Sequence, residues 1–207
     1  MAKQIAGVAE RILLCAKAEF LDKGYTDASL RVIAAAAETS TNSIYVRFGD
    51  KEGLFSAIVE PVLSEMTERF VKIQEAFHQM DGAQQKAHMA QYADGGTMEL
   101  VDYMYDHLDE FRLLLDASYG TRFHNFVDEL VRIEVEYTYQ YMQATGGFPG
   151  AQSPLAAQLL HIVTTSRFES IFEVIRHGMS REEAHEYVDL LSRYHRTGFS
   201  AIFGGAE

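Results

Sequence analysis

Three short polar residues, Thr41, Asn42 and Ser43, stand together near the start of the chain, and Tyr45 and Arg47 follow them. Hydroxyl and amide side chains of this size reach the edges of DNA bases, whereas tyrosine and arginine commonly donate hydrogen bonds to phosphates. On one short helix these residues would form a polar tip with a basic flank that fits the major groove. The spacing therefore favours recognition of double-stranded DNA.

A helix enters a groove only if other helices hold it, and the neighbouring sequence supplies two. Apolar residues spaced by three and four predict a first helix over residues 5–23, which Gly24 would end. Two short helices are expected over 29–37 and 40–48, and Ser40 is expected to cap the second. The residues expected to pack these helices together are Ile33, Ala34, Ala37 and Ile44.

The remaining sequence is also helical in pattern, and no segment alternates as a strand would. Asp50 is expected to cap a long helix that starts at Lys51 and is kinked at Pro61. Further helices are predicted over residues 82–92, 98–117, 122–144, 154–177 and 181–202, separated by glycines such as Gly95-Gly96 and the stretch 146–150. We therefore expect an all-α fold, with a three-helix N-terminal helix-turn-helix head (residues 1–49) followed by a C-terminal helical bundle with a dimerisation face (residues 50–207).

The net charge of −12 argues at first against nucleic acid, because phosphate binding depends on lysine and arginine. Residues 1–55, however, carry equal numbers of basic and acidic side chains, so the whole excess of acid lies in residues 56–207. This distribution is compatible with a protein that contacts DNA through its N-terminal head alone.

The sequence pattern gives no membrane, secretion or metal signal. No apolar run is long enough to span a membrane, and residues 1–5 do not resemble a signal peptide. The single cysteine, Cys15, cannot form an internal disulfide, and no cysteine or histidine spacing resembles a zinc site. We expect a cytoplasmic protein without a metal or cofactor.

The N-terminal segment resembles the DNA-binding domain of the TetR/AcrR regulators. The matching residues keep one register from Arg11 through Gly24-Tyr25 and Ile33-Ala34 to the run between Ser40 and Phe55. The resemblance implies a homodimer whose heads bind a palindromic operator. It also implies a C-terminal bundle that binds a small effector, usually with a loss of operator affinity, and repression as the mode of regulation.

Matching positions of the family pattern assign contacts to individual residues of this chain. The resemblance implies base contacts by Arg31, Thr41, Asn42 and Ser43, phosphate contacts by Ser29, Tyr45, Arg47 and Lys51, and a thymine methyl beside Val46. Glu38 departs from the pattern, because the family usually has glycine in this turn, and we expect strain there. Arg47 replaces a frequent histidine, and Ala28 replaces a frequent threonine.

The C-terminal bundle should hold the subunit contact and the effector pocket that the resemblance implies. The dimer interface is predicted on the last two helices, at Leu159, Val163, Tyr187, Val188, Leu191 and Tyr194. The effector pocket is predicted among the middle helices, at Tyr103, Met104, His107, Phe111, Arg122, Phe123, Phe126, Tyr137 and Tyr141. Their chemistry favours a largely apolar effector of unknown identity, and the alternative that these aromatic residues form only core stays open.

Two other classes of function compete with DNA binding. The chain has no phosphate-binding loop, nucleophile elbow or zinc-protease motif, so no enzyme activity is expected. Glu182 and His185 share a helix face, but a solvated acidic surface explains them better than a metal site. A helical protein-interaction module without DNA binding is the remaining alternative, and the salt dependence of DNA affinity would distinguish it.

Overall fold

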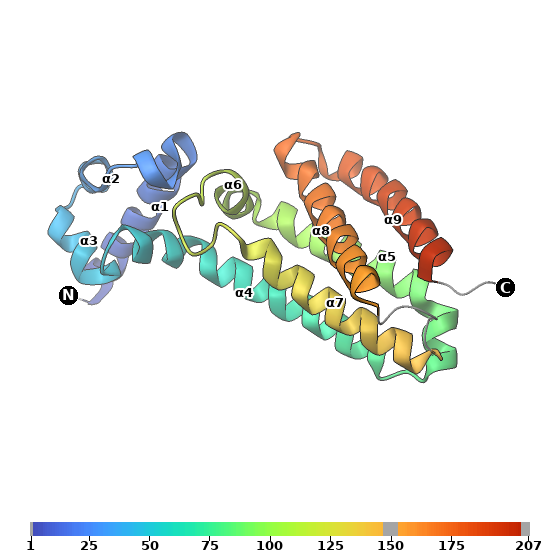
Figure 1. Cartoon of the computed structure of the whole chain (residues 1–207). Helices are drawn as coiled ribbons and strands as arrows, with labels where there is room; N and C mark the ends of the chain where they lie inside the picture. Colours follow the sequence, from blue (N-terminus) through green and yellow to red (C-terminus); the bar gives the residue numbers. More distant parts are fainter. Residues whose placement is uncertain (1, 147–152, 204–207) are drawn as a thin grey trace. The chain divides into compact units, whose positions relative to one another are not determined.

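The computed structural model describes residues 2–146 and 153–203, with side chains described from Gly7 onward. Most of these residues are in helices. No strand occurs in these ranges, so the predicted all-α fold class is confirmed. Figure 1 labels the helices, which are α1 (Ala2–Asp27), α2 (Leu30–Ala36), α3 (Thr41–Phe48), α4 (Lys51–His78), α5 (Gly82–Asp106), α6 (Leu108–Asp116), α7 (Phe126–Ala144), α8 (Pro154–Arg176) and α9 (Arg181–Phe203). The expected break at residues 147–150 lies outside the described residues.

The contacts divide the chain into two compact units. The first unit runs up to Glu65 and also takes in His107–His124, which contains α6; the second comprises Met66–Asp106 and the chain from Asn125 onward. Helix α4 therefore contributes residues to both units. This division by contacts differs from the single boundary expected between residues 49 and 50. The expected separation into a DNA-binding head and an effector-binding bundle stays a prediction about function.

The first unit is built around an aromatic cluster that joins α1, α4 and the segment after α6. The ring of Phe55 lies 5.1 Å from that of Phe20, edge to face, and 6.0 Å from that of Phe123. The backbone N–H of Tyr25 donates to the carbonyl of Ala117 at 2.9 Å, so the chain after α6 is tied to the end of α1. The residues predicted to pack α2 and α3, namely Ile33, Ala34, Ala37 and Ile44, are all buried, as expected.

The second unit is a bundle of α5, α7, α8, α9 and the later part of α4. Helix α7 packs beside α8, and α5 packs beside α9 (Figure 1). Met142, Leu160 and Phe203 form a buried cluster between α7, α8 and α9. A Cβ atom at Gly82 would lie 2.1 Å from the carbonyl oxygen of Ala144, so the start of α5 meets the end of α7 without room for a side chain.

Three helix boundaries differ from the sequence prediction. Helix α5 continues through Gly95-Gly96, which were expected to interrupt it. Its end is also earlier than expected, because the chain leaves helical geometry at His107 and α6 begins after it. Helix α7 begins at Phe126 rather than at residue 122. The expected end of the first helix is confirmed, because Gly24 has a φ of 71° and interrupts α1 before its last residues.

The described residues contain neither a membrane-spanning helix nor a metal-binding cluster. None of their helices has the length and apolar character needed to cross a membrane. No group of three or more His, Cys, Asp or Glu side chains in these ranges is arranged to hold a metal ion.

Candidate nucleic-acid interface

Helix α3 lies at the surface of the first unit with one anchor in the core. Ile44 is fully buried, whereas Asn42 is exposed and Tyr45 and Val46 are 52% and 74% exposed. Ser40 caps the helix by accepting a hydrogen bond from the backbone N–H of Ser43 at 3.2 Å, as predicted. Asn42, Tyr45 and Val46 on α3 are therefore accessible to a ligand.

The turn between α2 and α3 is closed by a left-handed residue. The backbone N–H of Thr39 donates to the carbonyl of Ala34 at 2.9 Å, and that of Glu38 donates to Ala35 at 3.1 Å, which is the Schellman pattern of a helix end. Glu38 takes the left-handed position with a φ of 52°, and it is the one non-glycine residue in the described ranges with a positive φ. Glycine adopts this conformation without the steric cost that a Cβ atom adds.

Glu38→Gly should therefore raise the free energy of unfolding by about 1 kcal/mol, because it removes the contact between Cβ and the carbonyl in a left-handed residue. Chemical denaturation monitored by circular dichroism measures the change. Ala36→Gly, in the last turn of α2, is the matched control and should lower stability by about 1 kcal/mol. Equal effects of the two glycines would contradict strain at Glu38.

Arg47 folds back along α3 toward the polar tip. Its Nη1 donates to the carbonyl of Ser43 at 3.1 Å and to the Ser43 hydroxyl at 2.6 Å. Its Nε is buried and has no hydrogen-bond partner among the described residues. A buried donor without an acceptor costs free energy, so this guanidinium has one hydrogen bond to gain from a new partner.

Lys51 ties the start of α4 to the end of α1. Its ammonium donates to the carbonyl of Thr26 at 2.9 Å and lies 5.0 Å from the centre of the Tyr25 ring. Partial burial lowers the pKa of Lys51 from its ordinary value. The carbonyl offsets the unfavourable position of a cation at a helix start, and the phosphate contact stays a prediction.

Two further predicted contacts, Ser29 and Arg31, lie at the start of α2. Ser29 precedes the helix, and its hydroxyl makes no cap bond, while its backbone N–H donates to the Glu19 carboxylate at 3.0 Å. Arg31 is exposed on α2. Thr41 is half-buried at the start of α3. The predicted contact residues thus all come from α2, α3 and the start of α4, within one unit.

The junction between α3 and α4 has no room for a side chain. Asp50 caps α4 by accepting a hydrogen bond from the backbone N–H of Gly53 at 2.7 Å, as expected. A Cβ atom at Gly53 would lie 1.9 Å from the carbonyl oxygen of Phe48, the last residue of α3. Glycine at this position therefore sets how closely α3 approaches α4.

Comparison with known families identifies this part of the chain. Residues 12–58 match the family model of the bacterial regulatory proteins, tetR family. The N-terminal segment of the chain is therefore similar to the N-terminal domain of the tetR family. In a helix-turn-helix the second helix of the motif enters the major groove, and α3 has the corresponding place in the matched segment. Family and fold together support a role in DNA-binding transcriptional regulation.

Solved structures share the fold of this chain at low sequence identity. A TetR-like transcriptional regulator from Rhodococcus sp. RHA1 matches with a TM-score of 0.60 at 19% identity, over 93% of this chain and 96% of that one. NalD, the secondary repressor of the MexAB-OprM multidrug efflux pump in Pseudomonas aeruginosa, matches with a TM-score of 0.59 at 17% identity, over 92% and 96%. A regulator from Aquifex aeolicus VF5 matches at 0.57 and 19%, over 95% and 99%. No curated protein matches the chain by sequence.

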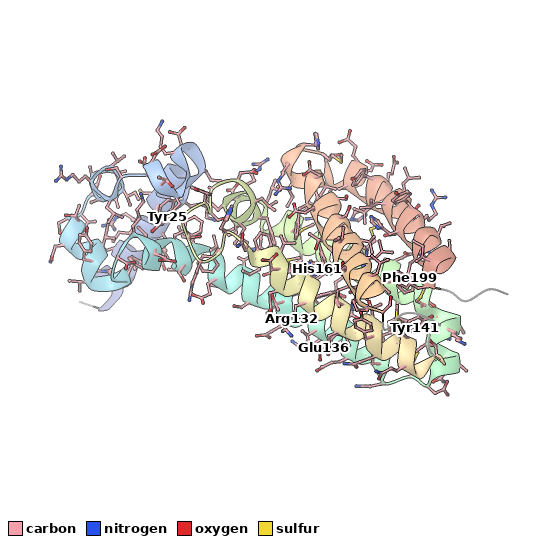
Figure 2. All side chains as sticks on the ribbon, viewed as in Figure 1. Tyr25, Arg132, Glu136, Tyr141, His161 and Phe199 are labelled. Atoms are coloured by element: carbon pink, nitrogen blue, oxygen red, sulfur yellow. The ribbon has the colours of Figure 1, made fainter. Side chains whose placement is uncertain are left out.

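A cavity of about 920 Å³ lies in the second unit, between α4, α5, α7, α8 and α9. Phe77 contributes to its aromatic wall, with its ring 5.6 Å from that of Tyr92 and 6.0 Å from that of Tyr141. Figure 2 labels Tyr141 on α7 and Phe199 on α9, and both residues line the cavity. Apolar walls and a volume of this size are typical of sites for drug-sized molecules.

The structure brings only part of the predicted effector pocket to this cavity. Met104, Tyr137 and Tyr141 line it. Tyr103 and Phe126 are buried in the second unit but are not part of the lining, whereas His107, Phe111, Arg122 and Phe123 belong to the first unit. Arg122 donates to Glu60 at 2.7 Å and to the Ser56 hydroxyl at 2.9 Å. Its guanidinium is thus already paired with an anion of its own chain.

The polar residues of the cavity were not predicted from the sequence. Arg167 lies in the wall with Nη1 at 2.9 Å from the Glu134 carboxylate and Nη2 at 2.8 Å from the Thr97 hydroxyl. Thr164 and Ser192 also line the cavity and are buried. Their spacing in the sequence could have indicated this position. Thr164 lies four residues from both Leu160 and Phe168, and Ser192 lies four residues after Val188, which itself follows Ala184 by four; all of these residues are buried.

The predicted dimer residues differ in exposure. Tyr194 is 74% exposed, Leu159, Val163, Tyr187 and Leu191 are half-buried, and Val188 is fully buried within its own chain. Other apolar residues of the two helices are exposed: Leu155 and Ile162 on α8, and Leu190 and Ile202 on α9. We call this set, together with Tyr194, the α8–α9 apolar face. Leu155 and Ile162 are two helical turns apart and therefore lie on one side of α8.

Proposed function

We propose that the protein is a homodimeric repressor that binds a palindromic operator and is released when a small molecule occupies the cavity. The observation that carries the proposal is α3, which Ile44 anchors while Asn42 and Tyr45 stand exposed at the surface. A short helix held in this way inserts its polar tip into the major groove. A regulator of this kind acts in the cytoplasm of a bacterium, where the chromosome lies.

The basic flank of α3 supports phosphate binding. On DNA, the buried Nε of Arg47 would gain a phosphate oxygen as acceptor, and the guanidinium would leave the Ser43 hydroxyl. Ser43 would then be available for a base edge beside Thr41, Asn42 and Arg31. The role of Arg47 is therefore twofold, because it contacts phosphate and releases a base-reading hydroxyl.

The α8–α9 apolar face supports assembly of two chains. It exposes large apolar side chains on two neighbouring helices, and apolar surface of this kind is commonly covered by a partner; its α9 residues Leu190, Tyr194 and Ile202 also line the cavity. A second copy is the partner that a palindromic operator requires, since each copy reads one half-site. The half-buried Tyr187 and Leu191 flank this face and belong to the proposed interface.

The Asn42→Ala variant should lose preference at one base pair of each half-site, by about 1–3 kcal/mol, because an amide that reads a base edge is removed. Tyr45→Ala should instead weaken binding to all sequences, because it removes a phosphate contact. Selection of bound sequences from a random DNA pool, followed by affinity measurement at several salt concentrations, checks both results.

Arg132→Ala is a suitable control, since it removes an exposed basic residue of the second unit that is paired with Glu129. It should leave both the selected sequence and the dependence of affinity on salt unchanged. A wild-type protein that selects no sequence and binds DNA without salt dependence would favour the protein-interaction module instead. An Asn42→Ala variant that weakens all sequences equally would contradict the assignment of base contacts.

A further inference from the structure

The charged side chains around the cavity are all neutralised within the protein. Each one that lines the cavity has an oppositely charged partner within the described chain, in the pairs Arg167–Glu134, Arg196–Asp94 and Arg193–Asp189. Glu134 is occupied on both oxygens, since Gln74 donates to the second one at 2.6 Å. A ligand that carries a charge would therefore find no free counter-ion in the wall and would lose its hydration on entry.

Of the two histidines in the cavity wall, one has an imidazole that is available to a ligand. Both nitrogens of His78 lie within hydrogen-bond distance of backbone carbonyls, those of Gln74 at 2.8 Å and Tyr137 at 3.0 Å. His195 has no hydrogen-bond partner among the described residues, and burial together with the nearby Arg167 lowers the pKa of its ring. His195 is thus a neutral group that can both donate and accept. Burial likewise raises the pKa of Tyr141, which stays a phenol.

Two buried hydroxyls of the wall lack the bond that other helical hydroxyls make. Thr165 and Ser170 donate to the carbonyl one turn earlier, at 2.9 Å and 2.7 Å. Thr164 and Ser192 are only 6% and 8% exposed, yet within the part of the chain that is described neither hydroxyl has a hydrogen-bond partner. Because neither hydroxyl is bonded within its own helix and both residues line the cavity, both hydroxyls are available to a polar group of a ligand.

These groups lie at one level of the α8–α9 hairpin. The two helices are joined by a short turn, and Thr164 and Ser192 are about equally far from it along the chain. His195 follows Ser192 within one turn of α9. Arg167 lies one turn from Thr164 on α8, and its charge contributes to the lowered pKa of the His195 ring. Helices joined by a short turn pair residues at equal distances from the turn, so the three open groups share one part of the wall.

We propose that the cavity binds an uncharged, largely aromatic molecule whose single polar group is received by Thr164, Ser192 and His195. The proposal rests on the proposed function, because it specifies the class of molecule that would release the operator. The paired charges exclude anions and cations, the aromatic wall receives the apolar part, and the open hydroxyls and imidazole fix its orientation.

Two dyes that differ by one charged group test the ligand class. N-phenyl-1-naphthylamine is uncharged and has one N–H, whereas 1-anilinonaphthalene-8-sulfonate has the same rings with a sulfonate. Titration of the purified protein without DNA, followed by fluorescence, should show one neutral dye per chain, with a Kd lower than that of the sulfonate by about tenfold or more. Equal or tighter binding of the sulfonate would overturn the proposal, because it would mean that Arg167 leaves Glu134 for the ligand.

Variants that remove the open hydroxyls test the polar end. Thr164→Val with Ser192→Ala should raise the Kd of the neutral dye roughly fivefold, while Tm stays close to that of the wild type because neither substitution breaks a hydrogen bond within the described chain. Thr165→Val is the matched control and should leave the Kd unchanged, since its hydroxyl is already bonded to its own helix. An unchanged Kd in the double variant would show that the ligand does not use these groups.

Operator binding is measured separately, with and without the neutral dye. The titrations without DNA decide the ligand class alone. A dye that binds as expected and leaves operator affinity unchanged would contradict only the proposed release of DNA, and it would leave the assignment of the cavity intact.

Discussion

A chain that carries Leu155→Asp and Ile162→Asp should have the molar mass of one subunit in light scattering, and its operator affinity should fall by about 100-fold or more. Both residues are exposed on one side of α8, where a carboxylate would have to be buried against the second chain. A palindromic operator is bound tightly because the second head binds as part of the same molecule, and a single subunit loses this advantage. Neither residue lines the cavity, so ligand binding should persist.

Leu14→Asp is a control for this experiment, since Leu14 is also an exposed apolar residue, 68% accessible, but lies on α1 in the other unit. It also adds a carboxylate, one instead of two, and should leave the molar mass at that of two chains. A double variant of α8 that still scatters as a dimer would place the subunit contact elsewhere on the chain. A wild-type protein that is monomeric at operator-binding concentrations would contradict the homodimer itself.

Replacement of Gly53 by alanine should lower the free energy of unfolding by roughly 3 kcal/mol and abolish specific DNA binding. The added Cβ atom would lie 1.9 Å from the carbonyl oxygen of Phe48, and backbone on both sides has to move to make room. The movement displaces the end of α3 and the Asp50 cap of α4 together. Thermal denaturation and operator titration measure the two effects.

Gly95→Ala is the matched control, because an added Cβ atom at this helical position has no neighbour within 4 Å. It should raise stability by about 1 kcal/mol, the usual gain when alanine replaces glycine inside a helix. The measurement also shows that the assay responds to glycine substitutions in either direction. Stability of Gly53→Ala equal to that of the wild type would contradict the close approach of α3 and α4.

The head could be predicted from the sequence because its signals are local. The Ser40 cap, the Asp50 cap and the buried Ile44 each follow from residue type and spacing over a few positions, and the structure has all three. The left-handed conformation of Glu38 could also be predicted, because a turn that usually needs glycine has the same geometry when another residue occupies it.

The errors in the bundle arose where packing between distant segments decides the outcome. Gly95-Gly96 would end an isolated helix, but α5 continues, and at Gly96 an added Cβ atom would lie only 2.6 Å from the Ile73 side chain. The glycine there serves a close approach of α5 and α4 rather than a turn. Local propensity does not contain this information, since Ile73 is far from Gly96 in the sequence.

The candidate cavity was predicted in part for the same reason. The effector pocket was predicted mainly at aromatic residues. Tyr137 and Tyr141 line the cavity, whereas Phe111 and Phe123 are buried in the first unit. Whether a hydroxyl faces a helix, a core or a cavity depends on neighbours that the sequence alone does not place.

The association of His107–His124 with the N-terminal helices affects how chimeric regulators should be assembled. A graft that ends at residue 49 would lack the segment that supplies Phe123 to the ring of Phe55 and the carbonyl of Ala117 to Tyr25. Swapping operator specificity between two such proteins therefore calls for exchange of two separate stretches, the chain up to Glu65 and the segment around α6. A hybrid made by one crossover inherits mismatched halves of a single hydrophobic core.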